Sequence, residues 1–430
     1  MFENYFQLKK HNTDVRTEFM AGLTTFLTMA YILAVNPGIL GKTGMDPHAI
    51  FTATALGSIV ATLVMALYAN LPFALAPGMG LNAFFAFTVV LGMGYSWEFA
   101  LTAVFLEGII FILLTFFKIR ELIVDAIPLT IKHAISAGIG LFIAFIGLHG
   151  AGIVVSDKAT LVTLGNLNNP TAWIALSGLL ITGILLALRI KGALIWGIFA
   201  STLIGIPLGI THFPHASLVQ LPPSIAPIFF KFQWHHILTI NMLIILFTFL
   251  FVDMFDTVGT LVGVASKANM LTKEGKLPGI NKALLADAIG TTFGAMVGTS
   301  TVTTYVESAA GVAEGGRTGL TALTTAILFI LALFLAPVFL MVPEAATAPV
   351  LIVVGSFMMS PVQKINFADY TESIPAFLTI ITMPLAYSIA DGIAFGMISY
   401  VILKVLSGRH NDVNWMMYIL TALFILKFIL

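Results

Sequence analysis

The sequence has no cysteine and unusually little charge. None of its 430 residues is cysteine, and only 9% are Asp, Glu, Lys or Arg. The missing thiols exclude disulfides, thiolate metal sites and cysteine nucleophiles. Soluble domains carry roughly 25% charged residues, so this composition excludes a soluble enzyme. The 20 basic and 20 acidic residues cancel, which leaves neither a basic face for nucleic acid nor an acidic tail.

Apolar runs take the place of the missing charge. Apolar residues make up 59% of the sequence, and runs of about 20 residues, long enough to cross a ~30 Å hydrocarbon layer, recur from Glu18 onward. The first run, Phe19 to Leu40, lacks an Ala-x-Ala-like cleavage site, so we expect the first transmembrane helix there and not a removable signal peptide. The pattern predicts an all-α, polytopic membrane protein.

The expected helices follow the hydropathy of the whole chain. They cover residues 19–40, 50–69, 78–93, 99–117, 133–153, 172–190, 192–211, 237–266, 283–298, 305–312, 318–341, 344–359, 374–406 and 413–429. The range 374–406 contains Pro384 and Gly392 and is too long for one crossing. It is therefore either one interrupted helix or two short ones, so the total number of helices is 14 or 15.

Basic residues gather on one side of this layout when the N-terminus is cytoplasmic. The cytoplasmic loops then hold Lys9, Lys10, Arg16, Lys118, Arg120, Lys132, Arg189, Lys191, Lys267, Lys273, Lys276, Lys282, Arg317 and Lys364. The opposite side has only Lys42, Lys158 and Lys231. Since cytoplasmic loops carry the excess of Lys and Arg, we expect a multi-pass protein of the cell membrane with its N-terminus in the cytoplasm.

Two interrupted segments point to an internal repeat. The ranges 71–82 and 298–311 are too rich in Pro, Gly or β-branched residues to be plain helices. Ala53–Ser58 resembles Ala286–Thr291, and each precedes one of these segments. Small residues at four-residue spacing also allow close helix packing without any repeat. The paired interruptions favour an inverted repeat of the kind found in secondary transporters.

Acidic residues inside the expected spans are candidates for function. Burying an ionised carboxylate at the bilayer centre costs at least ~2.5 kcal/mol. Asp253 and Asp256 share a helix face with Thr257 and Thr260, and two acids on one stripe favour a functional site over helix–helix hydrogen bonding. For Glu107, Asp287 and Asp391 we favour structural roles.

Glu307 directly follows the second interrupted segment, and Asn82 holds the matching place after the first. A short extended stretch that leads into a half-helix exposes backbone polar groups in mid-membrane, which requires protein or a wet cavity around it. Two half-helices would present their positive N-terminal ends to a ligand. Carboxylates, an amide and hydroxyls beside Phe84, Phe85 and Tyr305 suit a flat neutral solute with several N–H donors. A nucleobase fits this description.

Four motifs carry a resemblance to a known family. They are Ala76–Phe85, Phe251–Thr257, Thr303–Ser308 and Gly316–Thr321. In this order they resemble the hypoxanthine, adenine and guanine permease branch of the nucleobase:cation symporters. The resemblance implies 14 transmembrane segments in a seven-plus-seven inverted repeat like that of uracil permeases, with helices 3 and 10 preceded by short antiparallel strands. It also implies a core domain of residues 17–117 and 237–341 and a gate domain of residues 118–236 and 342–430.

The resemblance also implies the site residues. Carboxylates matching Asp256 and Glu307 hydrogen-bond the base, and Asn82 matches the Asn that follows the helix 3 break. The other residues assigned to the substrate site are Phe84, Thr260, Thr304 and Val306. Thr260 stands where uracil and xanthine members carry a polar residue or His, so a histidine cannot carry the proton there. The proton-coupling candidates are therefore Asp253, Asp256 and Glu307.

The expected function is import of a purine nucleobase by proton symport, with a core domain moving against a gate domain. No cofactor, metal site, catalytic residue or nucleic-acid partner is expected; the choice among hypoxanthine, guanine and adenine and a homodimeric state remain open. One alternative is an anion exchanger of the same fold, which should not carry an acid at Glu307. Another is a membrane-embedded prenyltransferase, since Asp253-x-x-Asp256 resembles a diphosphate–magnesium motif, although a second acidic cluster is lacking.

Overall fold

The computed structural model describes residues 2–116, 128–212, 217–235, 237–267, 270–272 and 277–429. Lys118, Arg120, Lys273 and Lys276, expected in cytoplasmic loops, lie outside the described residues, as does the end of the helix expected over 99–117. Within the described part, nine helices are long and apolar enough to cross a membrane, and three apolar helices are shorter. The expectation of 14 spans stays a prediction.

The first half begins with the short helix α1 (Phe2–Phe6). Its remaining helices are α2 (Val15–Met29), α3 (Ile32–Leu40), α4 (Pro47–Val64, continued by a π-helical turn over Met65–Ala69), α5 (Met79–Ala83, continued by a π-helix over Phe84–Gly92), α6 (Trp97–Phe116), α8 (Leu129–Gly150), α9 (Pro170–Ala187) and α10 (Ala193–Gly205). The start of α4 follows from local chemistry. Asp46 accepts hydrogen bonds from the backbone of His48 and Ala49, and Pro47 fits the first helical turn because it has no N–H to satisfy.

The second half is also mostly helical. Its helices are α11 (Ile240–Lys267), α12 (Ile280–Val297), α13 (Ser308–Ala313), α14 (Gly319–Ala332), α15 (Ala336–Leu340), α16 (Glu344–Met358), α17 (Tyr370–Leu385), α18 (Ile389–Leu406) and α19 (Trp415–Ile429). The range 374–406, left open as one helix or two, is two. The chain turns between α17 and α18 at Tyr387, whose φ is 53°, and Ser388 caps α18 by accepting from the backbone N–H of Asp391.

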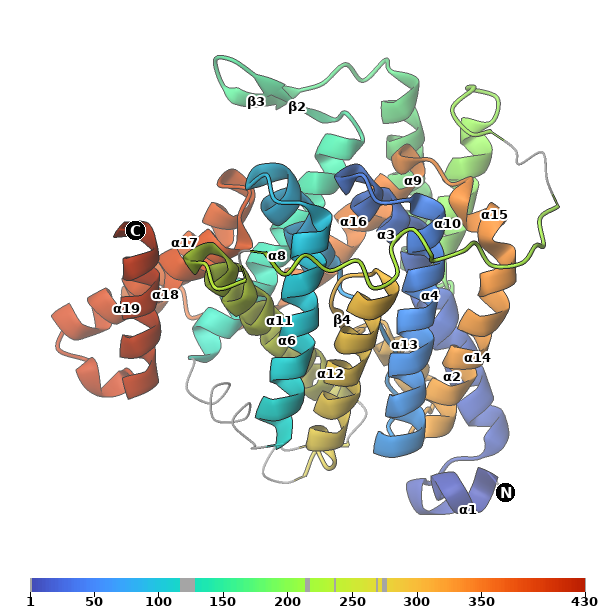
Figure 1. Ribbon diagram of the computed structural model, residues 1–430, viewed down its shortest axis with the longest axis horizontal. Helices are drawn as coiled ribbons and strands as arrows, with labels where there is room; N and C mark the ends of the chain where they lie inside the picture. The colour runs from blue at the N-terminus through green and yellow to red at the C-terminus, as the bar shows by residue number, and fades with distance from the viewer. Residues whose placement is uncertain are drawn as a thin grey trace.

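Two short strands lie inside the interrupted ranges. β1 (Leu75–Pro77) pairs antiparallel with β4 (Val302–Thr304), with Ala76 opposite Thr303, and Figure 1 places β4 in the middle of the helices. Thr62 bonds both the N–H and the C=O of Leu75, and Thr291 does the same for Val302. Because backbone polar groups cannot stay unpaired in a bilayer, this ribbon and its two threonines make the interruptions tolerable.

A second strand pair was not predicted. β2 (Val154–Asp157) and β3 (Leu161–Leu164) form a hairpin that projects from the top of the body in Figure 1. Asp157 accepts hydrogen bonds from the backbone of Thr160 and Ala159 in the turn, and these bonds lower the pKa of its carboxyl group. The hydropathy analysis overlooked the hairpin because its strands are only four residues long and largely exposed.

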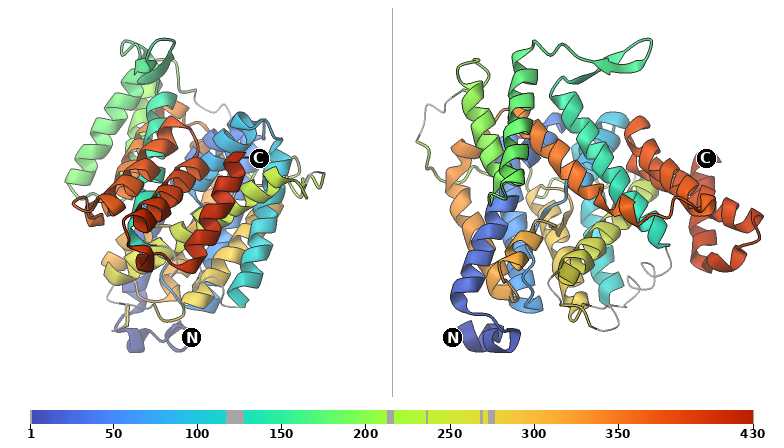
Figure 2. Two further views of the ribbon diagram at one scale, coloured as in Figure 1. Left: turned by 90° about the vertical axis from the view of Figure 1, so that its left-hand side faces the viewer. Right: turned by 180° about the vertical axis from the view of Figure 1, so that it is seen from behind.

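The helices form two groups by their contacts. In one, α8 packs against α16 and α17, and α16 packs against α9 and α10. In the other, α4 packs against α12 and α14, while α6 packs against α11 and α12. Both groups therefore combine helices from the two halves of the chain, and Figure 2 shows how these helices lie from two further sides. The segment 217–235 runs across the second group (Figure 1), where Phe230 donates to the C=O of Met296.

Ion pairs join the C-terminal end of α18 and the loop after it to the start of α17. The Lys404 side chain is only 1% exposed and lies 2.6 Å from Glu372 and 3.4 Å from Asp412. Arg409 donates to Asp369 at 2.6 Å, and this bond holds the pKa of Asp369 at about 2. A buried lysine is costly unless it is paired, so Glu372 and Asp412 explain how Lys404 is tolerated.

Candidate functional site

A cavity of about 560 Å³ lies beside the β1–β4 ribbon. Its wall combines the turn from β1 into α5, the middle of α11, the residues after β4, and the facing sides of α8 and α16. Five of the seven residues predicted for the substrate site line it: Asp256, Thr260, Thr304, Val306 and Glu307. Small-molecule pockets typically measure roughly 300–1,000 Å³, so this cavity has the size of a ligand site.

Glu307 is held at the start of α13 by the first span. The Tyr31 hydroxyl donates to Glu307 Oε1 at 2.6 Å. The Thr28 hydroxyl lies 3.4 Å from the Glu307 main-chain oxygen but is closer to the Thr25 carbonyl oxygen, at 2.8 Å. Tyr31 also lines the cavity. Tyr31 is not among the residues predicted from the sequence, where its one signal is a hydroxyl-bearing aromatic residue inside an otherwise apolar run.

Asp253 and Asp256 share a helix face but have different surroundings. Asp256 is half-buried and lines the cavity. Asp253 is fully buried. The hydroxyl of Thr257, one turn later in the same helix, lies 3.2 Å from the Asp253 carboxyl group, 2.8 Å from that of Asp287 and 2.7 Å from the Thr303 hydroxyl. Asp253 and Asp287 therefore belong to a buried polar cluster behind β4, and only Asp256 faces the cavity.

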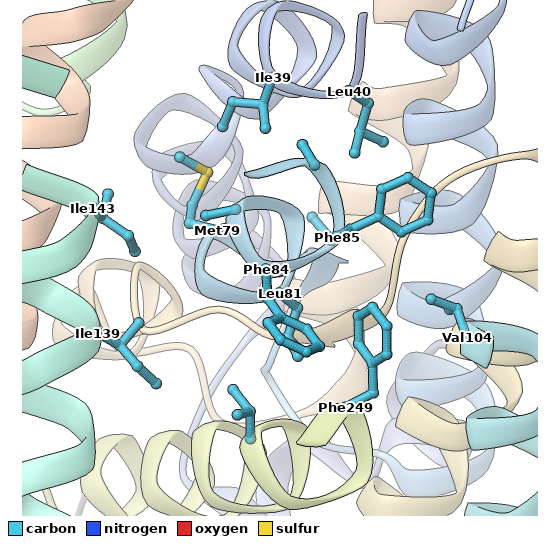
Figure 3. Close-up of a cluster of buried hydrophobic side chains, with 14 of the residues drawn as sticks. Ile39, Leu40, Met79, Leu81, Phe84, Phe85, Val104, Ile139, Ile143 and Phe249 are labelled. Carbon is cyan, nitrogen blue, oxygen red and sulfur yellow. The ribbon is translucent and has the colours of Figure 1, made fainter. Parts of the chain in front are cut away.

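Asn82 and Phe84 do not line the cavity, although both lie close to the ribbon. The Asn82 side chain accepts a hydrogen bond from Ser300 and lies 3.4 Å from the Pro77 carbonyl oxygen, to which it donates. The Phe84 ring packs edge-on against Phe249, with ring centroids 4.8 Å apart, within the apolar cluster of Figure 3. These two residues support the half-helix from behind the cavity wall.

Comparison with known proteins decides the family. A family model described as a permease family matches residues 16–395. A permease of Methanocaldococcus jannaschii is 53% identical over 99% of this chain and 98% of its own length. The chain belongs to the nucleobase:cation symporter family.

Other members of this family have named substrates. The adenine permease AdeQ of Escherichia coli is 44% identical over 99% of this chain and 95% of its own length. The guanine/hypoxanthine permease PbuG of Bacillus subtilis is 46% identical over 99% of both chains. These relatives are permeases and not enzymes. This member of the family is therefore a multi-pass membrane transporter, and the prenyltransferase alternative is wrong.

The fold has a counterpart outside the family. The transmembrane domain of the cyanobacterial bicarbonate transporter BicA has a TM-score of 0.65 to this chain, at 18% identity, and the match covers 88% of this chain and 96% of BicA's. At this identity the likeness concerns the fold alone. The nucleobase:cation symporter family member thus shares its helical architecture with an anion transporter, while its substrate has to be inferred from the site.

Three consecutive hydroxyls hold the segment before β4. Thr299 accepts from the Asn36 amide at 3.0 Å, Ser300 donates to Asn82, and Thr301 donates to Glu107 at 2.6 Å. Each partner comes from a different span of the first half, namely α3, α5 and α6. Glu107 therefore has the structural partner that its burial requires. Within the described part of the chain, no group of three His, Asp or Glu side chains is arranged to hold a metal ion.

Proposed function

We propose that this protein imports a purine nucleobase across the cell membrane by proton symport. The observation that carries the proposal is that Asp256 and Glu307 face one cavity beside the ribbon. Ionised carboxylates only accept hydrogen bonds, and a purine presents ring and exocyclic N–H donors along its edges. The adenine and guanine/hypoxanthine permeases among the relatives support this substrate class.

The rest of the cavity suits a flat heterocycle. Met79 and Ile139 supply apolar surface, and the residues from Thr303 to Val306 lie in the wall. Thr260 and Thr304 add hydroxyls that can pair with ring nitrogens or carbonyl oxygens. Asn82 and Phe84 take part indirectly in this proposal, by fixing the half-helix that forms the opposite wall.

Proton coupling uses a carboxyl group of this site or of the cluster behind it. The candidates remain Asp253, Asp256 and Glu307. One positive charge that enters down an inside-negative potential of 100 mV releases about 2.3 kcal/mol, which supports roughly 50-fold accumulation of substrate. Protonation also removes the cost of burying a charged carboxylate in a closed, dry site, so a loaded and protonated site can change its access from one side to the other more easily than a charged one.

Two sets of glycine contacts support the seven-plus-seven inverted repeat. α4 and α12 cross where Gly57 meets Gly294 and where Gly290 meets Ala61, and these contacts exchange under the sequence match of the two halves. Gly197 of α10 packs against Thr182 of α9. Gly396 of α18 packs in the same way against Thr379 of α17.

In this scheme α17 and α18 repeat α9 and α10, and α19 lies outside the repeat. The first of the two helix groups is then the gate domain and the second is the core domain. With the N-terminus cytoplasmic, the cavity reaches the cytoplasmic ends of α8 and α16 at Lys132 and Lys364. We therefore assign this conformation as inward-facing.

An anion exchanger of the same fold is not favoured. Its support is limited to the shared fold with the bicarbonate transporter. A substrate anion would approach the carboxylates of Asp256 and Glu307 in one cavity, and like charges at close range repel strongly where water is scarce. A neutral base meets no such repulsion.

The test is uptake of radiolabelled hypoxanthine, guanine and adenine into proteoliposomes with an imposed pH gradient. Loss of a hydrogen bond to a charged group costs roughly 1.5–3 kcal/mol, so Asp256→Asn and Glu307→Gln should each lower uptake at least tenfold. Asp157→Asn, in the turn of the β2–β3 hairpin, is the control that should keep normal uptake.

Normal purine uptake by both site variants would contradict the site assignment. Uptake that ignores the pH gradient would contradict proton coupling. Bicarbonate uptake without purine uptake would instead establish the anion exchanger.

A further inference from the structure

Tyr31 stands at a junction in the first span. α2 ends at Met29 and α3 begins at Ile32, so Tyr31 lies in the short turn between two helices. Its side chain is only 1% exposed, yet it forms part of the cavity wall together with Asp256 and Glu307. A tyrosine buried in this way usually has a partner for its hydroxyl group.

The partner is the carboxyl group of Glu307. The 2.6 Å distance between Tyr31 Oη and Glu307 Oε1 falls in the range of strong O–H···O⁻ bonds. Thr28, one turn earlier, donates instead to the carbonyl oxygen of Thr25 in its own helix. The first span therefore holds Glu307 by its carboxyl group.

Tyr305 provides a comparison within the same cavity. Its hydroxyl donates to the Pro77 carbonyl oxygen, also at 2.6 Å, and its ring centroid lies 6.5 Å from that of Tyr31. Both tyrosines are buried and line the cavity. Only Tyr31 bonds a carboxyl group, whereas Tyr305 ties the chain after β4 to β1.

We propose that Tyr31 is a positioning residue that orients Glu307 for the substrate. With Oε1 engaged by the phenol, the carboxyl plane is fixed and Oε2 is the oxygen directed to a ligand N–H. A carboxyl group on a free rotamer would have to be ordered at each binding event, which lowers affinity. This inference rests on the proposed function, because it assumes a substrate with N–H donors such as a purine.

The experiment measures equilibrium binding of radiolabelled hypoxanthine and adenine to the purified protein in detergent. Tyr31→Phe keeps the ring and removes the donor, so the Kd should rise about tenfold. In the Glu307→Ala background, which leaves the Tyr31 hydroxyl no acceptor at this position, the same change should add less than about twofold, because the two residues act through one bond. Any rise in Kd that Tyr305→Phe causes in the wild-type protein should be equally large in that background, because the Tyr305 hydroxyl bonds the Pro77 carbonyl oxygen and not Glu307. The uptake KM should rise in Tyr31→Phe while the maximal rate changes little.

Several outcomes would overturn the proposal. Wild-type affinity in Tyr31→Phe excludes the role, and an equal loss in the Glu307→Ala background shows that Tyr31 acts by another route. A wild-type protein that binds no purine overturns the proposed function itself, and with it this role. If Tyr31→Phe shows no thermal transition, Tyr31→His, which keeps an N–H donor, is compared with Tyr31→Leu. Equal affinities of these two variants would exclude the role of the donor.

Discussion

At the scale of single residues, Glu18 shows how a buried acid can serve structure alone. Its side chain is fully buried. One carboxyl oxygen accepts from the backbone N–H of Arg317 at 2.9 Å, and the other accepts from the N–H and hydroxyl of Thr321 at 3.1 and 2.6 Å. A negative charge at a helix N-terminus is favourable because the free N–H groups and the helix dipole face it. Glu18 on α2 thus caps α14 together with the N-cap residue Thr318, whose hydroxyl accepts from the Leu320 N–H.

We expect Glu18→Gln to lower the free energy of unfolding by about 2 kcal/mol, because each bond to a charged group is worth roughly 1.5–3 kcal/mol. Thermal unfolding of the protein in detergent measures the loss. Glu98→Gln, in the first turn of α6, is the matched control and should change stability less. Purine affinity should stay within about twofold of wild type in both variants, since a global stability change does not remove a contact in the cavity. Equal losses in the two variants would contradict the capping role.

At the scale of elements, close helix pairs depend on single glycines. A Cβ atom added at Gly396 would overlap the Thr379 hydroxyl of the neighbouring helix α17. Gly183 of α9, by contrast, has open space where its Cβ would lie. Since interiors are close-packed, an added methyl group forces neighbours to move only where space is lacking.

Gly396→Ala should therefore destabilise the protein by about 1–3 kcal/mol. Thr379→Ala in the same chain removes the overlapping atoms and should restore most of this loss. Gly183→Ala is the control and should be neutral or slightly stabilising, because alanine favours helices over glycine. Unfolding temperatures in detergent compare the four proteins. A double variant as unstable as Gly396→Ala would show that the overlap is not the cause.

The elements also show what sequence reasoning can reach. Pro, Gly and β-branched residues in 71–82 and 298–311 marked the interrupted segments, because a cluster of such residues lowers the helix propensity of a short range. The cost of acids in a bilayer singled out Asp256 and Glu307, which line one cavity. The Tyr31–Glu307 hydrogen bond could not be predicted from the sequence, because 276 positions separate the two residues and no local pattern encodes such a pair.

Side-chain direction was equally hard to foresee. Helical spacing puts Asp253 and Asp256 on one face but cannot say that Asp253 shares the Thr257 hydroxyl with Asp287 of α12 while Asp256 faces a cavity. Likewise, the position of Phe84 next to Asn82 predicts proximity to the site, whereas its ring turns toward Phe249 (Figure 3). Tertiary packing determines these side-chain orientations, and the local helix propensity of the sequence holds no information about that packing.

At the scale of the whole molecule, the absence of cysteine allows the solvent accessibility of a chosen position to be measured from either side of the membrane. A single introduced cysteine is then the only thiol in the chain that a reagent can label. Ser136 lines the cavity. We expect Ser136→Cys to react with a membrane-impermeant maleimide from the cytoplasmic side, and purine at ten times its Kd should slow the reaction about tenfold. Asp157→Cys in the β2–β3 turn should react from the opposite side, without protection by purine. Labelling of both thiols from one side would contradict the proposed orientation and the inward-facing assignment.

The β1–β4 ribbon has a consequence for how the protein is made. Pro77 and Val302 face each other in the ribbon, so about 225 residues must be synthesised after the first strand before its partner exists. At a translation rate of roughly 5–20 residues per second, this interval lasts roughly ten to forty-five seconds. During this time the N-terminal half is inserted with backbone groups that have no partner strand. We therefore expect the half-made chain to be degraded faster than the finished protein, because unpaired backbone groups are costly in a bilayer.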